Sequence, residues 1–304
     1  MNILDTFSLQ GSLFIMILTG LWLRKRGVLD EDGQRVLTDL CIDIVIPCNI
    51  LKSFLGGMGP DVLRKGFLIL VSGFLLQILC LLLNLFLFNR WEPAQKKVLQ
   101  YCTIVSNGGF LGNPVAEGIY GMEGLLYASI FLIPMRIVMW SAGTSYFVSG
   151  TADRRKVIRN VLTHPCLVAV YLGIAIMMSG ISLPPMLESA VRSIGSCNSA
   201  LTMFIIGIIL ADVPLNTIVG KTSVLFSIFR LGILPLAAYA LCTALGLSGA
   251  ARGVPVLMTG MPAGATASIF AARYKSDAPF ATKIVVLSTL LSMVTLPLWS
   301  LILE

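Results

Sequence analysis

Two stretches of the sequence combine helix-breaking residues with hydrogen-bonding ones, and each lies inside an apolar segment long enough to cross a bilayer. The first reads Ser-Asn-Gly-Gly-Phe-Leu-Gly-Asn-Pro over residues 106–114, and the second reads Thr-Gly-Met-Pro-Ala-Gly-Ala-Thr-Ala-Ser over 259–268. Glycine and proline interrupt the regular hydrogen bonding of a helix. Within a membrane, an interruption is tolerated only where the freed backbone groups face protein or a watery cavity. Paired interruptions of this kind are typical of a transporter's binding site.

Half-helices that start after each interruption would present the positive ends of their dipoles and free N–H donors at mid-membrane, where they favour a carboxylate. Substrate contacts are therefore predicted in both stretches, at Asn107, Gly108, Gly109, Asn113, Pro114, Met261, Pro262 and Ala263. Hydroxyl groups nearby are candidates for further hydrogen bonds or for lining an ion path, at Ser106, Thr259, Thr266 and Ser268. The competing interpretation is that these small polar residues only pack between crossing helices.

Composition places the rest of the chain in a membrane. Of its 304 residues, 56% are hydrophobic and 12% are charged, whereas a soluble domain carries roughly twice that charged fraction. Apolar stretches of about 20 residues, the length of a membrane-crossing helix, recur from end to end. The sequence therefore predicts an all-α polytopic membrane protein. Its ten predicted spans are 7–23, 36–56, 66–88, 96–119, 124–149, 157–180, 187–211, 222–246, 251–272 and 279–302.

The net charge of +7 reflects the orientation of the spans, because lysine and arginine concentrate in cytoplasmic loops. One set of alternate loops is rich in basic residues: Arg24, Lys25, Arg26, Arg35, Arg90, Lys96, Lys97, Arg154, Arg155, Lys156, Arg159, Lys221, Arg273 and Lys275. The other set holds Arg64, Lys65, Arg192 and Arg252. This asymmetry predicts that both termini lie outside the cytoplasm and that the basic loops serve topology, not nucleic-acid binding.

This orientation makes residues 1–152 and 153–304 two inverted repeats of five spans each. The interrupted spans are the fourth and the ninth, which occupy the same position in the two halves. Their order, orientation and interruptions agree with one another, as expected of a transporter built from inverted repeats.

Ionisable residues inside spans are costly and are therefore candidates for function. Asp43, in the second span, is a candidate for proton coupling or for pairing with a cation, and a structural ion pair or a water-facing position is the alternative. Arg136 and Arg230, in the fifth and eighth spans, are candidates for drawing an anion inward. Pairing with helix carbonyls or snorkelling is their alternative role. His164, the single histidine, precedes Pro165 and is expected to cap a helix.

The ordered set of motifs resembles the auxin efflux carrier family of membrane transporters in its short bacterial form, over essentially the whole chain. The motifs that carry the resemblance are Ile46-Pro47 with Ile50-Leu51, the 106–114 stretch, Arg230 with Pro235, Met261-Pro262-Ala263 through Ala271-Ala272-Arg273-Tyr274, and the stretch 287–298. The resemblance implies the fold of bile-acid symporters and sodium/proton antiporters. In that fold a scaffold, here spans within 7–56 and 157–211, flanks a transport core, here spans within 66–149 and 222–302.

The resemblance also implies that the broken fourth and ninth helices cross near the bilayer centre, with the substrate beside the crossing. The substrates known in the family are small organic anions such as indole acetate, malonate and malate. The acidic residue that helps to bind sodium in the ninth helix of bile-acid symporters has no counterpart between residues 254 and 272. Coupling to protons, to sodium or to neither ion therefore stays open, and no other cofactor is expected.

Other classes of protein fit less well. An ATP-driven pump would need a Gly-rich phosphate loop ending in Gly-Lys-Ser/Thr, and an intramembrane enzyme would need a motif such as His-Glu-x-x-His or Gly-x-Ser-x-Gly; the sequence contains none of these. A channel or a membrane-embedded sensor that uses the same fold is the remaining alternative. The prediction is a secondary transporter of small mono- or dicarboxylates in the cell membrane. Its expected partners are the substrate and the lipid bilayer, and whether it forms a homodimer is open.

Overall fold

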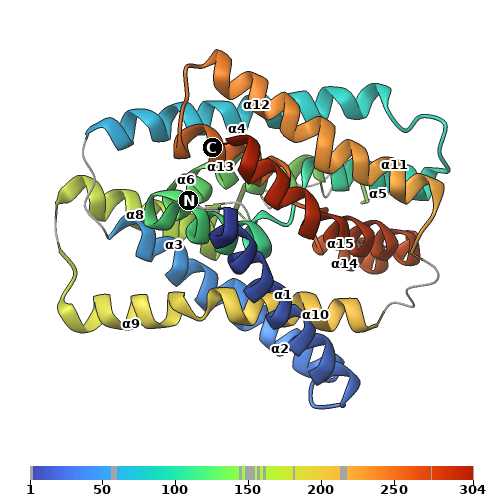
Figure 1. Ribbon diagram of the computed structural model, residues 1–304, viewed down its shortest axis with the longest axis horizontal. Helices are drawn as coiled ribbons and strands as arrows, with labels where there is room; N and C mark the ends of the chain where they lie inside the picture. The colour runs from blue at the N-terminus through green and yellow to red at the C-terminus, as the bar shows by residue number, and fades with distance from the viewer. Residues whose placement is uncertain are drawn as a thin grey trace.

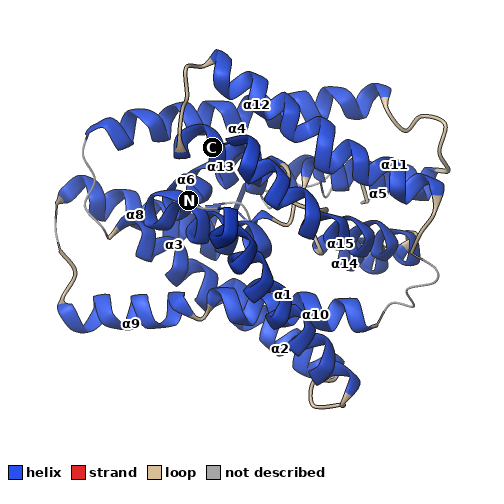
Figure 2. Cartoon of the chain, in the orientation of Figure 1, coloured by secondary structure: helices blue, strands red, loops and turns tan. Residues whose placement is uncertain are grey.

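The computed structural model describes residues 3–55, 60–143, 146–147, 155, 158–159, 162–180, 182–212, 218–274 and 276–303. Over these residues the chain is helical (Figure 2), and its one β-type contact is an isolated antiparallel bridge between Ser106 and Ala263. The predicted all-α class is thus confirmed. Five helical stretches are long and apolar enough to cross a membrane, namely Arg64–Phe86, Gly108–Val138, Pro185–Ala211, Lys221–Ala244 and Ala278–Leu303.

The first half of the chain supplies helices for the first five predicted spans. In order they are α1 (Ile3–Lys25), α2 (Glu31–Leu40), the π-helical η1 (Cys41–Val45), α3 (Ile46–Phe54), α4 (Pro60–Phe86), α5 (Pro93–Ile104), the π-helical η2 (Gly108–Gly112), α6 (Asn113–Val138) and the π-helical η3 (Met139–Gly143). Gly121, at φ 64° and ψ −149°, breaks α6 between the predicted fourth and fifth spans. Only glycine adopts this conformation without strain, which allows the chain to turn there. The end of the predicted fifth span, at 148–149, lies outside the described residues.

The second half supplies helices for the other five spans. They are α8 (Pro165–Ser179), α9 (Pro185–Ser196), α10 (Asn198–Ala211), α11 (Lys221–Ile228), the π-helical η5 (Phe229–Ile233), α12 (Leu234–Ala244), α13 (Ala250–Thr259), α14 (Thr266–Arg273) and α15 (Ala278–Leu303). The sixth span was predicted to start at 157, but α8 begins at Pro165. Residues 156–157 and 160–161, like Arg154 and Lys275, lie outside the described residues.

Three of the π-helical turns end two residues before a proline, and the proline explains why a π-helical turn forms there. The ring of Pro47, Pro114 or Pro235 clashes with the carbonyl four residues earlier, so the normal helical bond cannot form there. The residue before each proline instead donates its N–H five residues back, from Ile46 to Cys41, from Asn113 to Gly108 and from Leu234 to Phe229. These prolines therefore widen their helices locally and do not end them.

Helices distant in sequence pack closely. In Figure 1, α9 and α10 run along one edge of the molecule and α4 and α12 along the opposite edge, with α6 and α13 between them. The helix α1 packs along α10, α3 packs against α8 and α9, and α6 packs against α4 and α13. At the α1–α10 contact, a Cβ atom added to Gly20 or Gly207 would collide with the backbone of the opposite helix. Small residues that allow such close approach are typical of helix packing in membranes.

Candidate substrate site at the helix crossing

The two interrupted segments cross and bond to each other through their backbones. After α5 ends, Val105 is extended, and Ser106 forms the antiparallel bridge with Ala263. The N–H of Asn107 donates to the Pro262 carbonyl at 2.8 Å, and the N–H of Gly264 donates to the Val105 carbonyl at 3.1 Å. Each interruption therefore satisfies backbone groups freed by the other, as a buried break requires.

The two interruptions are not alike in where the helix unwinds. In the first, the non-helical residues are 105–107, and Pro114 lies inside the following half-helix α6. In the second, the non-helical residues are 260–265, and Pro262 lies among them. Pro114 follows a widened turn that remains helical, so the first helix unwinds about seven residues before the proline, where the partner segment supplies hydrogen bonds.

A buried arginine clamps the crossing. Arg230, 3% exposed, lies in η5 and donates from Nε to the Met261 carbonyl at 3.0 Å and from Nη1 to the Thr103 carbonyl at 2.8 Å. Both carbonyls lie at the ends of half-helices, where the dipole is negative and a cation is favourable. The hydroxyl of Ser288 accepts the Ala263 N–H at 3.1 Å. The structure thus places Arg230 against helix carbonyls, the alternative role considered for it.

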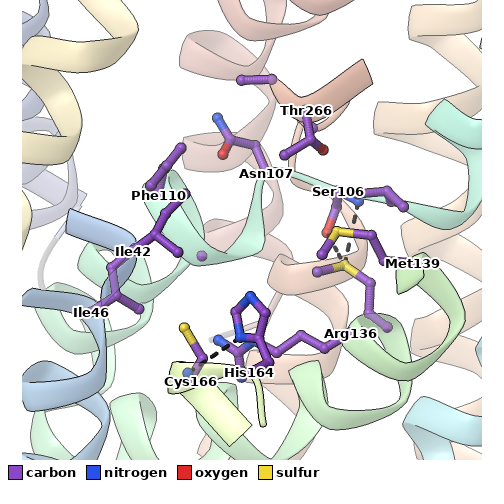
Figure 3. A pocket seen from close by; sticks show the side chains of 15 residues that line it. Ile42, Ile46, Ser106, Asn107, Phe110, Arg136, Met139, His164, Cys166 and Thr266 are labelled. Carbon is purple, nitrogen blue, oxygen red and sulfur yellow. Dashed lines mark hydrogen bonds between the residues drawn. The ribbon is translucent and has the colours of Figure 1, made fainter. Parts of the chain in front are cut away.

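A cavity of about 140 Å³ lies beside the crossing (Figure 3). Its lining consists of Ile42, Ile46, Val105, Ser106, Asn107, Gly109, Phe110, Met135, Arg136, Met139, His164, Cys166, Gly264, Ala265 and Thr266. Five of the predicted site residues are brought together here, namely Ser106, Asn107, Gly109, Arg136 and Thr266. A Cβ atom on Gly109 would meet nothing within 4 Å, so this glycine leaves the cavity open.

The polar groups of the cavity gather at two ends. Asn107 and Thr266 lie at one end and Arg136 and His164 at the other (Figure 3). The Thr266 hydroxyl is 2.8 Å from the Tyr101 hydroxyl. Nδ1 of His164 accepts the Cys166 N–H at 3.3 Å, at the first turn of α8. The expectation that His164 caps a helix is therefore confirmed. The amides of Gly108 and Gly109 open the half-helix after the break, where helical acceptors are missing.

The predicted residues of the first stretch that do not line this cavity are buried elsewhere. A Cβ atom on Gly108 would lie 2.6 Å from a methyl group of Leu132, so the glycine allows close packing. Asn113 is fully buried, and neither its Nδ2 nor its Oδ1 has a hydrogen-bond partner among the described residues. Pro114 is buried beside it.

The remaining predicted residues have separate surroundings. Met261, Pro262 and Ala263 form the crossing through their backbones, as described above. The Thr259 hydroxyl donates to the Pro255 carbonyl at 2.7 Å, within its own helix. The Ser268 hydroxyl is buried without a partner in the described part of the chain. Asp43 lies in η1 with an exposed side chain, next to the cavity residue Ile42.

One functional candidate was missed by the sequence analysis. Glu117, in α6, pairs with Lys52 of α3 at 2.7 Å, and Nδ2 of Asn49 donates to the other carboxylate oxygen at 3.2 Å. The side chains of Lys52 and Glu117 are 12% and 24% exposed. The available signal was a carboxylate inside a predicted span, but Glu117 lies so near the end of that span that it resembled a solvated residue.

Comparison with known proteins gives full-length matches. The profile of the family described as "Membrane transport protein" matches residues 11–300. An uncharacterized transporter of Methanothermobacter thermautotrophicus is 28% identical over 300 residues, which cover 96% of both chains. A second, from Methanocaldococcus jannaschii, is 23% identical over 96% of both chains. The uncharacterized transporter YfdV of Escherichia coli K12 is 22% identical over 94% of both chains.

Proposed function

Because this chain belongs to the membrane transport protein family, the family of the auxin efflux carriers that its motifs predicted, we propose that it is a secondary transporter of small organic anions. Family membership and the long apolar helices make it a multi-pass membrane transporter. The finer proposal adds the class of substrate, alternating access as the mechanism, and a substrate position at the crossing of the two interrupted helices.

The observation that carries this proposal is the cavity beside the crossing. It combines a guanidinium (Arg136), an amide (Asn107) and a hydroxyl (Thr266) with apolar walls, the combination that typifies small-molecule sites. An anion would receive hydrogen bonds from the guanidinium and from the amide groups at the start of a half-helix.

The walls of the cavity support a mechanism of alternating access. Ile42, Ile46, His164 and Cys166 come from the predicted scaffold, and the other lining residues come from the predicted core. A shift of the core against the scaffold would therefore change the walls around a bound substrate. The Lys52–Glu117 pair joins the same two groups of helices, so it would have to open or move during such a shift.

Counterflow in proteoliposomes tests the proposal. Vesicles that hold unlabelled carboxylate and the purified protein are diluted into a trace of the labelled compound. A carrier exchanges and transiently accumulates the label, whereas a channel only equilibrates it and a sensor binds it without transport. Repeating the assay at two pH values, with and without sodium, identifies the coupling ion. Failure of every mono- and dicarboxylate in a broad panel would refute the proposal.

Filling the cavity tests the position of the site. Gly109→Leu extends a side chain into open space, so we expect the fold to survive and transport to fall more than tenfold, which corresponds to about 1.4 kcal/mol. The matched control is Gly232→Leu, because Gly232 also lies in a π-helical turn with nothing within 4 Å of an added Cβ atom, but does not line the cavity. Equal transport by the two variants would place the substrate elsewhere.

A further inference from the structure

Arg136 is a buried cation that no carboxylate among the described residues neutralises. The residue is 4% exposed, and its Nη1 is buried without a hydrogen-bond partner among the described residues. It takes part in none of the ion pairs between described residues, which are Arg24–Asp212, Arg35–Asp32, Lys52–Glu117 and Arg192–Glu188. An unpaired buried charge destabilises a folded protein unless something else compensates for it.

Arg230 shows how the same protein satisfies a buried arginine when the role is structural. Two of its nitrogens bond helix carbonyls, at 3.0 and 2.8 Å. Arg136 is equally buried, but its Nη1 has no such bond, and it lines a cavity. The difference between the two arginines indicates that the partner of Arg136 comes from outside the chain.

The surroundings of Arg136 define that partner. The guanidinium end of the side chain lies beside His164 and Cys166, at the start of α8 (Figure 3). The positive end of the α8 dipole adds to the charge of the guanidinium. No aspartate or glutamate is among the residues that line the cavity. An anion placed here therefore meets two sources of positive potential, and Asp43, whose carboxylate acts electrostatically on Cys166, lies outside the lining with an exposed side chain.

The remaining walls limit the ligand to a single charge. Between the Arg136 end and the end formed by Asn107 and Thr266, the lining is mostly apolar and includes Ile46 and Phe110, and the Ser106 hydroxyl there is 3.3 Å from Sδ of Met135. A second carboxylate at the Asn107 end would meet only neutral donors and the partial charge of a half-helix dipole, which offset less of its desolvation cost than a guanidinium does. A hydrocarbon body suits this middle part of the cavity.

From these contacts we propose that Arg136 anchors the anionic group of the substrate, and that the cavity takes a monocarboxylate with an apolar body in preference to a dicarboxylate. This inference rests on the proposed function and deepens it. It assigns the charge of the site to a side chain facing the start of α8, and leaves the apolar walls between the two ends of the cavity to hold the hydrocarbon body of the ligand.

The test compares three probes of equal chain length on the purified, full-length protein in detergent: hexanoate, its neutral amide hexanamide, and the dicarboxylate adipate. Binding is measured by titration calorimetry. We expect hexanoate to bind the wild type more tightly than either of the other two. Arg136→Gln should weaken hexanoate binding by about 30-fold or more, because the charge pair is lost, and should abolish the preference over hexanamide. Arg136→Lys should restore part of that preference.

The stability of the ligand-free variants separates binding from structure. Arg136→Gln removes an uncompensated charge, so its unfolding temperature should equal or exceed that of the wild type. The matched control is Arg230→Gln, which removes the two hydrogen bonds of the guanidinium and should lower the unfolding temperature. A lower unfolding temperature for Arg136→Gln with an unchanged preference for hexanoate would overturn the inference. So would tighter binding of adipate, or no binding of any probe to the folded wild type.

A counterflow assay distinguishes failure of this inference from failure of the proposed function. Transport of a dicarboxylate at equal rates by the wild type and Arg136→Gln would refute the inference about Arg136 but would still support the transporter proposal. Arg136-dependent binding of hexanoate, with no counterflow of any organic anion, would support the inference about Arg136 and refute the transporter proposal.

Discussion

Replacing Arg230 by methionine removes the clamp at the helix crossing while nearly keeping the volume of the side chain. Each hydrogen bond from a charged donor contributes about 1.5–3 kcal/mol, and Arg230 makes two, to the Thr103 and Met261 carbonyls. Removal of the buried cation offsets part of this loss, because its desolvation cost disappears as well. We expect local opening of the crossing to become easier by about 3 kcal/mol.

Cys102 reports this opening, because it is fully buried next to Thr103. A thiol reagent labels it only when the crossing opens, and peptide mass spectrometry measures the rate at this one cysteine. When opening and closing are fast, the labelling rate follows the open population, so 3 kcal/mol corresponds to about a hundredfold faster labelling. Arg192→Met, which removes only a partly exposed ion pair with Glu188, should change the rate by less than about threefold.

Labelling of Cys102 in Arg230→Met at the wild-type rate would show that Arg230 does not hold the crossing closed. If that variant also lost substrate binding, Arg230 would have to be reassigned from holding the crossing to contacting the substrate.

Two further predictions concern polar groups outside the cavity. The Lys52–Glu117 pair should show a coupling energy of about 1–2 kcal/mol in a double-mutant cycle of Lys52→Met and Glu117→Gln, measured by chemical unfolding; a value near zero would mean that the pair does not join α3 to α6 energetically. Asn113→Ala should lower transport at least tenfold, or about 1.4 kcal/mol, with little loss of stability, because its buried amide makes no hydrogen bond to the described part of the chain that could be lost. Normal counterflow by this variant, or a drop of several degrees in its unfolding temperature, would contradict that interpretation.

The sequence alone determined the class of the fold and the position of the two interruptions. Apolar length and low charge are local properties, so they predicted helices from end to end. Glycine and proline act on the backbone where they stand, and so the stretches 106–114 and 259–268 could be identified without the fold. The same motifs predicted the family that the full-length match confirms.

The point of unwinding required the tertiary structure. The sequence predicted an interruption somewhere within the stretch 106–114, but the chain unwinds at 105–107, where Pro262 and Gly264 bond to the backbone. An interruption in a membrane forms where another segment can satisfy the freed groups, and a single segment of sequence does not show where that partner lies.

The roles of the charged residues were likewise decided in three dimensions. Arg136 and Arg230 look alike in sequence, since each is a lone cation in an apolar span. Packing gives Arg230 two carbonyls from distant helices, turns Arg136 toward a cavity beside the start of α8, and joins Glu117 to Lys52. The energy of a buried charge depends on the partners that surround it, and those partners meet only when the chain has folded.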